Sequence, residues 1–134
     1  MNRRAFLFAT AVAATVSHAA QKAPALAAPD LQVIYVGGLD CPPCTQWKTT
    51  RKATWLASPE YRQVSWIEVE SPRLRDAYQA RYWPGELKPV LDQLPRRSGT
   101  PRFLIVRDGR VVANQAGVSK WAIILTDLKQ QLGE

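Results

Sequence analysis

The stretch from residue 31 to residue 44 reads LQVIYVGGLDCPPC, an apolar run followed closely by two cysteines with two prolines between them. The β-branched and apolar residues Leu31–Val36, bounded by Pro29-Asp30 and Gly37-Gly38, predict a buried strand. The residues from Pro42 to about Leu56 suit a helix, because prolines are tolerated in a first turn and large apolar residues recur at helical spacing. We therefore expect both cysteines at a helix N-terminus.

The remainder of the chain continues this alternation of strands and helices. The predicted elements are a strand at 64–69, helical segments at 71–82 and 86–94, a hairpin with strands 102–107 and 110–114 joined by Asp108-Gly109, and a last helix capped by Ser119. The order predicts an α/β fold in one domain. Its mixed central sheet would be built as βαβ and then ββα, with helices on both faces.

Composition and cysteine count narrow the function classes. The 134 residues are 46% hydrophobic and 22% charged, which is typical of one globular domain and excludes a disordered or fibrous chain. A bridge between Cys41 and Cys44 would close a very short loop and remove little entropy from the unfolded chain. The cysteine pair therefore favours chemistry over structural support, although a structural disulfide and two inert thiols remain alternatives.

Residues 1–27 are predicted to be a secretory signal peptide. Arg3 and Arg4 precede an apolar run, and the first acidic residue is Asp30. The apolar run is shorter than the roughly 20 residues needed to span a bilayer, so cleavage is favoured over an anchor. Cleavage after Ala27, rather than after Ala19, would leave a domain of residues 28–134.

The export route is read from the same segment. Arg3-Arg4-Ala5-Phe6-Leu7 resembles part of a twin-arginine signal, with ordinary secretion and a mitochondrial presequence as alternatives. Either bacterial route leads to the periplasm or outside the cell, where disulfides persist. Removal of Arg3, Arg4 and Lys22 lowers the net charge from +7 to +4, which is only mildly basic.

The predicted helix N-terminus gives the cysteines a physical reason to react. Unpaired amides and the helix dipole favour thiolate over thiol, so Cys41 is expected to attack a disulfide and Cys44 to resolve the product. We expect the first sulfur to be the more exposed. Zinc needs four ligands, and the only histidine, His18, lies in the signal, so no metal is expected without a partner's ligands.

Residues 30–132 resemble the thioredoxin-like superfamily. The resemblance rests on the first strand, the Cys41-Pro42-Pro43-Cys44 motif, Gly99-Thr100-Pro101 before the hairpin, and Gly117 before the last helix. It implies that Thr100-Pro101 is a cis peptide facing the first cysteine. It also implies that Thr100 and Pro101 bind substrate, since the backbone before this proline pairs with an extended substrate segment in that family.

The chain departs from the family at the residue that assists proton transfer. Tyr35 stands where many thioredoxins have a buried aspartate. Asp40 and Glu68 are candidate proton carriers in its place, and solvated surface carboxylates are the alternative. Among the five tryptophans, Trp83 is the one not expected in the core, because it stands beside Pro84-Gly85.

These observations predict a periplasmic thiol:disulfide oxidoreductase acting on protein disulfides, with reduction favoured over oxidation. No flavin, nicotinamide or nucleic-acid motif is present, so no cofactor is expected. The dithiol would be reset by a redox partner, for which a membrane electron carrier is a candidate. The single domain predicts a monomer. The alternatives are a partner-specific regulatory or metallochaperone-like protein that forms a mixed disulfide without turnover, and a scaffold with a permanent disulfide.

Overall fold

The computed structural model describes residues 30–134, and the predicted signal peptide lies outside these residues. The four strands are β1 (Leu31–Gly38), β2 (Ser65–Ser71), β3 (Arg102–Arg107) and β4 (Arg110–Ala116). They form one sheet in the order β2-β1-β3-β4, with β1 parallel to β2 and the other neighbours antiparallel. The predicted mixed sheet is therefore confirmed.

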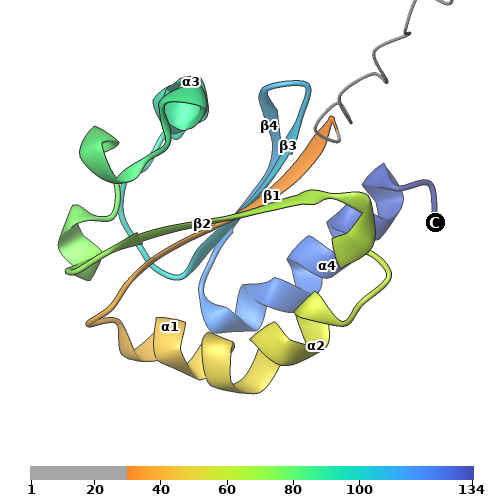
Figure 1. Ribbon diagram of the computed structural model, residues 1–134, viewed down its shortest axis with the longest axis horizontal. Coiled ribbons are helices and arrows are strands. Elements are labelled where there is room, and N and C mark those ends of the chain that lie inside the picture. The colour runs from red at the N-terminus through yellow and green to blue at the C-terminus, as the bar shows by residue number, and fades with distance from the viewer. Residues whose placement is uncertain (1–29) are drawn as a thin grey trace, which may run out of the picture.

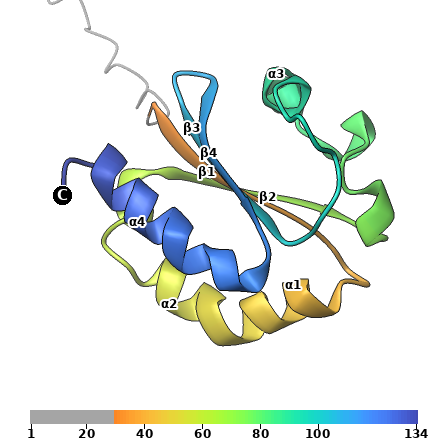
Figure 2. The same ribbon diagram turned by 180° about the vertical axis from the view of Figure 1, so that it is seen from behind.

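Helices cover both faces of the sheet, as Figures 1 and 2 show. On one face lie α1 (Pro42–Trp47), a π-helical segment (Lys48–Lys52) and α2 (Ala53–Leu56), which follow one another without a break, together with α4 (Trp121–Gln131). The other face carries α3 (Lys88–Asp92) and several short turns. No helix within residues 30–134 has the length and apolar character that a membrane span requires.

The side-chain alternation of β1 divides the core into two parts. Val33 and Tyr35 point toward α1 and α4, whereas Ile34 and Val36 point toward the segment that contains α3. Phe103 of β3 joins the first part. This first part is rich in aromatic rings, whose centroids lie 4.8 to 6.4 Å from their neighbours: Tyr35, Trp47, Trp55, Tyr61, Trp66, Phe103 and Trp121. Both cysteines belong to the same cluster.

The helix predicted over 71–82 is wrong. The chain there forms two single 3₁₀ turns, Leu74–Asp76 and Ala80–Tyr82. Tertiary contacts take the backbone groups that a helix would use, because the Ala77 carbonyl accepts a hydrogen bond from the Trp83 indole at 2.8 Å. The expectation for Trp83 is corrected by the same contact, since its side chain is buried in the second part of the core.

The remaining boundaries differ less from the prediction. The segment predicted at 86–94 is a 3₁₀ turn (Gly85–Leu87) followed by α3. Ser119 does not cap the last helix, because a 3₁₀ turn (Val118–Lys120) comes first and α4 begins at Trp121 without a side-chain cap. The Asp108-Gly109 turn lies between β3 and β4 as predicted, with positive φ angles of 50° and 79°.

Candidate redox site

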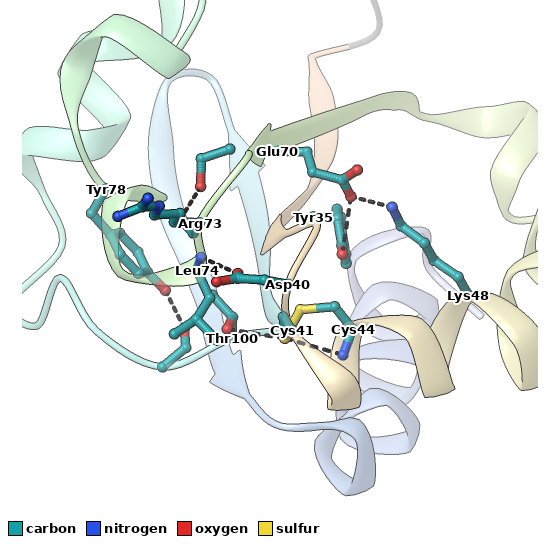
Figure 3. The surroundings of a disulfide bond; sticks show 12 residues. Tyr35, Asp40, Cys41, Cys44, Lys48, Glu70, Arg73, Leu74, Tyr78 and Thr100 are labelled. Carbon is teal, nitrogen blue, oxygen red and sulfur yellow. Dashed lines mark hydrogen bonds and ion pairs between the residues drawn. A yellow bond between two sulfur atoms is a disulfide. The ribbon is translucent and has the colours of Figure 1, made fainter.

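The two cysteines form a disulfide at the start of α1, directly after the loop that follows β1 (Figure 3). Cys41 is the N-cap residue, and its Sγ accepts a hydrogen bond from the Cys44 amide at 3.2 Å. Pro42 and Pro43 occupy the first turn, where amide groups have no partner within the helix. The N-terminus of this helix therefore presents a donor to the first sulfur, as the sequence predicted.

Thr100 contacts the same sulfur from the other side. Its Oγ1 lies 3.2 Å from Cys41 Sγ, and the Thr100-Pro101 peptide is cis, as the resemblance implies. Both cysteine residues are only 1% exposed, so the expectation of a more exposed first sulfur is corrected. Residues 59 positions apart in the sequence thus meet at one sulfur atom.

The two candidate proton carriers have other partners in the structure. Asp40 is exposed, and its Oδ1 accepts a hydrogen bond from the Leu74 amide at 2.6 Å. Glu68 is also exposed and forms an ion pair with Lys52 at 2.7 Å. Asp40 directly precedes Cys41 in the sequence, whereas Glu68 is paired with Lys52 of the π-helical segment. The roles of both carboxylates in proton transfer stay predictions.

Sequence reasoning missed a carboxylate that is tied to Tyr35. Glu70, near the end of β2, accepts a hydrogen bond from the Tyr35 hydroxyl at 3.4 Å and forms an ion pair with Lys48. Burial, followed by the charge of Glu70, raises the pKa of Tyr35 far above its usual value. The phenol therefore stays protonated at neutral pH, and its hydroxyl is hydrogen-bonded to the carboxylate of Glu70.

The position of Tyr35 depends on a glycine. A Cβ added at Gly37 would lie 2.1 Å from the Tyr35 hydroxyl oxygen, so only glycine leaves room for the phenol.

The sequence does contain a signal for the contact between Lys48 and Glu70. Lys48 follows Cys44 by one helical turn, and Glu70 lies on the same face of β2 as Glu68 but two residues nearer the dithiol end.

The described residues offer no assembled metal site, because no group of three or more histidine, cysteine, aspartate or glutamate side chains comes together within residues 30–134. Neither of the two cysteines there is free. The donors at the dithiol are an amide and a hydroxyl, which suit a thiolate.

Comparison with solved structures places the fold. No protein-family model matches the chain, and no curated protein sequence matches it. The periplasmic thioredoxin SoxS of Paracoccus pantotrophus is similar with a TM-score of 0.55 and 15% identity, over 75% of this chain and 98% of that one. The thioredoxin of Malassezia sympodialis is similar with a TM-score of 0.52 and 15% identity, over 75% of this chain and 78% of that one. The thioredoxin of Trypanosoma brucei brucei is similar with a TM-score of 0.52 and 16% identity, over 80% of this chain and 79% of that one.

The chain therefore has a thioredoxin-like fold with a CXXC disulfide at a helix N-terminus. This combination is consistent with thiol:disulfide exchange, in which a thiolate attacks a disulfide sulfur.

Proposed function

We propose that the chain is an exported oxidoreductase that reduces disulfides of other proteins through Cys41 and Cys44. One observation carries this proposal: Cys41 Sγ lies between two donors, the Cys44 amide and the Thr100 hydroxyl, each at 3.2 Å. Once the bridge is reduced, both donors can stabilise the Cys41 thiolate. The first attack on a substrate is therefore assigned to Cys41.

The electrons in this reaction pass only between the two thiols and the substrate disulfide. The Cys41 thiolate attacks one substrate sulfur, the substrate S–S bond breaks, and the released substrate thiolate takes a proton. Cys44 then loses its proton, and its thiolate attacks Cys41 Sγ. The bond between Cys41 and the substrate breaks, and the second substrate thiolate leaves and takes a proton. The substrate gains two electrons and two protons, and the Cys41–Cys44 disulfide forms. A dithiol partner, for which a membrane-bound protein is a candidate, returns the two electrons.

Export is the second part of the proposal. It is supported by the signal-like sequence of residues 1–27 and by the similarity in fold to a periplasmic thioredoxin. The test is to produce the full chain in a bacterium, fractionate the cells and sequence the N-terminus of the product. A periplasmic product that begins at Ala28 is expected. A full-length cytoplasmic product would contradict the proposal of export.

The catalytic proposal is tested by insulin reduction with dithiothreitol as electron donor. Wild-type protein is expected to accelerate precipitation of the insulin B chain, and Cys41→Ala to abolish the acceleration. Cys44→Ala is expected to accumulate a mixed disulfide through Cys41, visible by mass spectrometry. Mixed-disulfide formation with one partner but no turnover of insulin would favour the partner-specific binding protein instead.

The direction of electron flow is tested separately, by equilibrating the dithiol with glutathione mixtures. A reduction potential near about −270 mV or below is expected for a reductase. A value near about −120 mV would make the protein a disulfide donor.

A further inference from the structure

Arg102 is a buried cation behind the loop that carries Thr100. It is the first residue of β3, and the residue is 8% exposed. Its guanidinium donates three hydrogen bonds: Nε to the Tyr78 hydroxyl at 2.6 Å, Nη1 to Asn114 Oδ1 at 2.5 Å and Nη2 to the Ser98 carbonyl at 2.5 Å. Within residues 30–134, no carboxylate forms an ion pair with it. All three acceptors are neutral groups.

The Tyr78 hydroxyl extends these contacts to the next residue of the loop. It accepts the hydrogen bond from Arg102 and donates its own proton to the Gly99 carbonyl at 2.5 Å. Burial raises the pKa of Tyr78, and the nearby guanidinium only partly offsets this effect. The hydroxyl therefore keeps its proton at neutral pH and can serve as the donor to Gly99.

Both backbone polar groups of Thr100 are open to a partner. The carbonyls of Ser98 and Gly99 are held as described, and the Pro101 carbonyl accepts a hydrogen bond from the Gly117 amide at 2.8 Å. The structure gives neither the amide nor the carbonyl of Thr100 a partner among residues 30–134. The Thr100 side chain, in contrast, contacts Cys41. The loop thus presents the N–H and the C=O of Thr100, both without a backbone partner in the described part of the chain, beside the reactive sulfur.

We propose that Arg102 is a positioning residue for substrate binding, which holds the Thr100 backbone where an extended segment of a protein disulfide pairs with it. The inference rests on the proposed function and deepens it. Arginine suits the task because its planar fork reaches three acceptors in fixed directions, whereas lysine offers one mobile ammonium group. A buried cation without a carboxylate is costly to desolvate, so the fold alone gives little reason to keep it.

The test compares two substrates that differ in their need for the Thr100 backbone. Insulin presents its disulfides within peptide segments, whereas 5,5′-dithiobis(2-nitrobenzoate) is a small disulfide without a peptide backbone. Arg102→Met keeps most of the aliphatic stem and removes the fork. We expect kcat/KM for insulin to fall about tenfold, mainly through KM, because a displaced loop misaligns the substrate. The rate constant with the small disulfide is expected to stay within about twofold of wild type.

Arg107→Met is the matched control. Arg107 is the last residue of the same strand, and its guanidinium, like that of Arg102, donates hydrogen bonds to neutral acceptors. Its Nε donates to Gln131 Oε1 at 2.8 Å, and its Nη2 donates to the Gln131 carbonyl at 2.5 Å. These contacts hold the end of α4, at the opposite end of β3 from Thr100. The control variant is expected to lose stability as Arg102→Met does, yet to reduce both substrates like wild type.

A milder variant keeps the test open if Arg102→Met folds poorly. Tyr78→Phe removes only the hydroxyl, and a smaller rise in KM for insulin is expected. Nitrogen-15 order parameters of Gly99 and Thr100 are expected to fall in both variants but not in Arg107→Met.

Two outcomes would overturn the inference: unchanged KM for insulin in Arg102→Met and Tyr78→Phe, or an equal loss with both substrates. A wild-type protein that does not reduce insulin would instead refute the proposed function. The order parameters would still report whether Arg102 holds the loop.

Discussion

The Asp40 carboxylate accepts a hydrogen bond from the Leu74 amide at 2.6 Å, which joins the loop before the dithiol to the segment after β2. The Leu39 amide donates to the Ser71 carbonyl at 2.9 Å, parallel to this contact. A Cβ on Gly38 would lie 2.5 Å from the Leu74 backbone, so the two segments are in close contact. The irregular segment after β2 therefore lies beside the loop that leads into the disulfide (Figure 3).

Asparagine and alanine at position 40 separate the structural role of Asp40 from a role in proton transfer. Asp40→Asn keeps an oxygen that can accept from Leu74, so its free energy of unfolding is expected to stay within about 0.5 kcal/mol of wild type. Asp40→Ala loses the acceptor and is expected to cost about 1 kcal/mol. Urea denaturation measures both. A pH profile of insulin reduction in Asp40→Asn that matches wild type would contradict the predicted proton carrier.

Glu70→Gln is expected to slow insulin reduction about tenfold near neutral pH if the carboxylate beside Tyr35 moves the proton of the resolving step. The physical reason is that Tyr35 lies in the same core cluster as Cys44 and donates a hydrogen bond to Glu70, which links this carboxylate to the surroundings of the dithiol. Glu86→Gln is the control, because Glu86 is an exposed glutamate in the 3₁₀ turn Gly85–Leu87. Equal rates in the two variants, measured from pH 5 to 9, would exclude this assignment for Glu70.

Thr100→Val replaces the hydroxyl beside Cys41 by a methyl group of similar size. Because the hydroxyl can donate to the thiolate, its loss is expected to move thiolate formation to higher pH by about one pH unit. Absorbance of the thiolate at 240 nm, followed during a pH titration of the reduced protein, measures this shift. Thr49→Val, on the exposed side of the helix, is the control. An unchanged titration would show that the contact does not stabilise the thiolate.

Gly37→Ala is expected to destabilise the protein by about 2 kcal/mol, because the added Cβ would overlap the Tyr35 hydroxyl in a packed core. Gly85→Ala serves as comparison, since a Cβ there meets nothing within 4 Å. Thermal and urea unfolding of the two variants give the difference. Equal stability of Gly37→Ala and wild type would mean that the phenol moves aside without cost.

Stability is expected to fall as the pH rises above about 10. A tyrosine in the unfolded chain ionises near pH 10. Tyr35 and Tyr78 have raised pKa values in the folded protein, so they keep their protons there while the unfolded chain loses them. Their contribution to stability is complete below pH 10 and declines above it.

Urea denaturation from pH 8 to 11 tests this dependence. Tyr35→Phe and Tyr78→Phe should each flatten the decline above pH 10, and Tyr82→Phe, at a position outside the fully buried core, provides the comparison. A decline of the same steepness in Tyr35→Phe and wild type would contradict the assigned cause.

The parts of the fold that the sequence predicted well are those defined by local signals. The apolar run of β1 and the Asp108-Gly109 turn depend on residues that are adjacent in the sequence, so the sequence alone predicts them. The segment 71–87 is different, because distant partners fix its backbone. Trp83 binds the Ala77 carbonyl and Asp40 binds the Leu74 amide, and neither contact has a periodic signature.

The residues of the candidate site also fall into two groups, those that a local motif marks and those that only the structure brings together. Cys41, Cys44 and Thr100 were found because a motif and a proline step mark them. Glu70 and Arg102 carry no such mark, since an arginine after a proline is most often a surface residue. They stand out only through their contacts with two phenols, Tyr35 and Tyr78, which are 35 and 24 residues away in the sequence.

The aromatic cluster around the disulfide has an optical consequence. Four aromatic rings surround Trp47, and its centroid lies 5.2 Å from those of Phe103 and Trp121. Such close indoles share their excitation, and a disulfide in the same cluster is an efficient quencher of their emission. Reduction of the bridge should therefore brighten the intrinsic fluorescence of the protein, so that the chain reports its own redox state without any added dye.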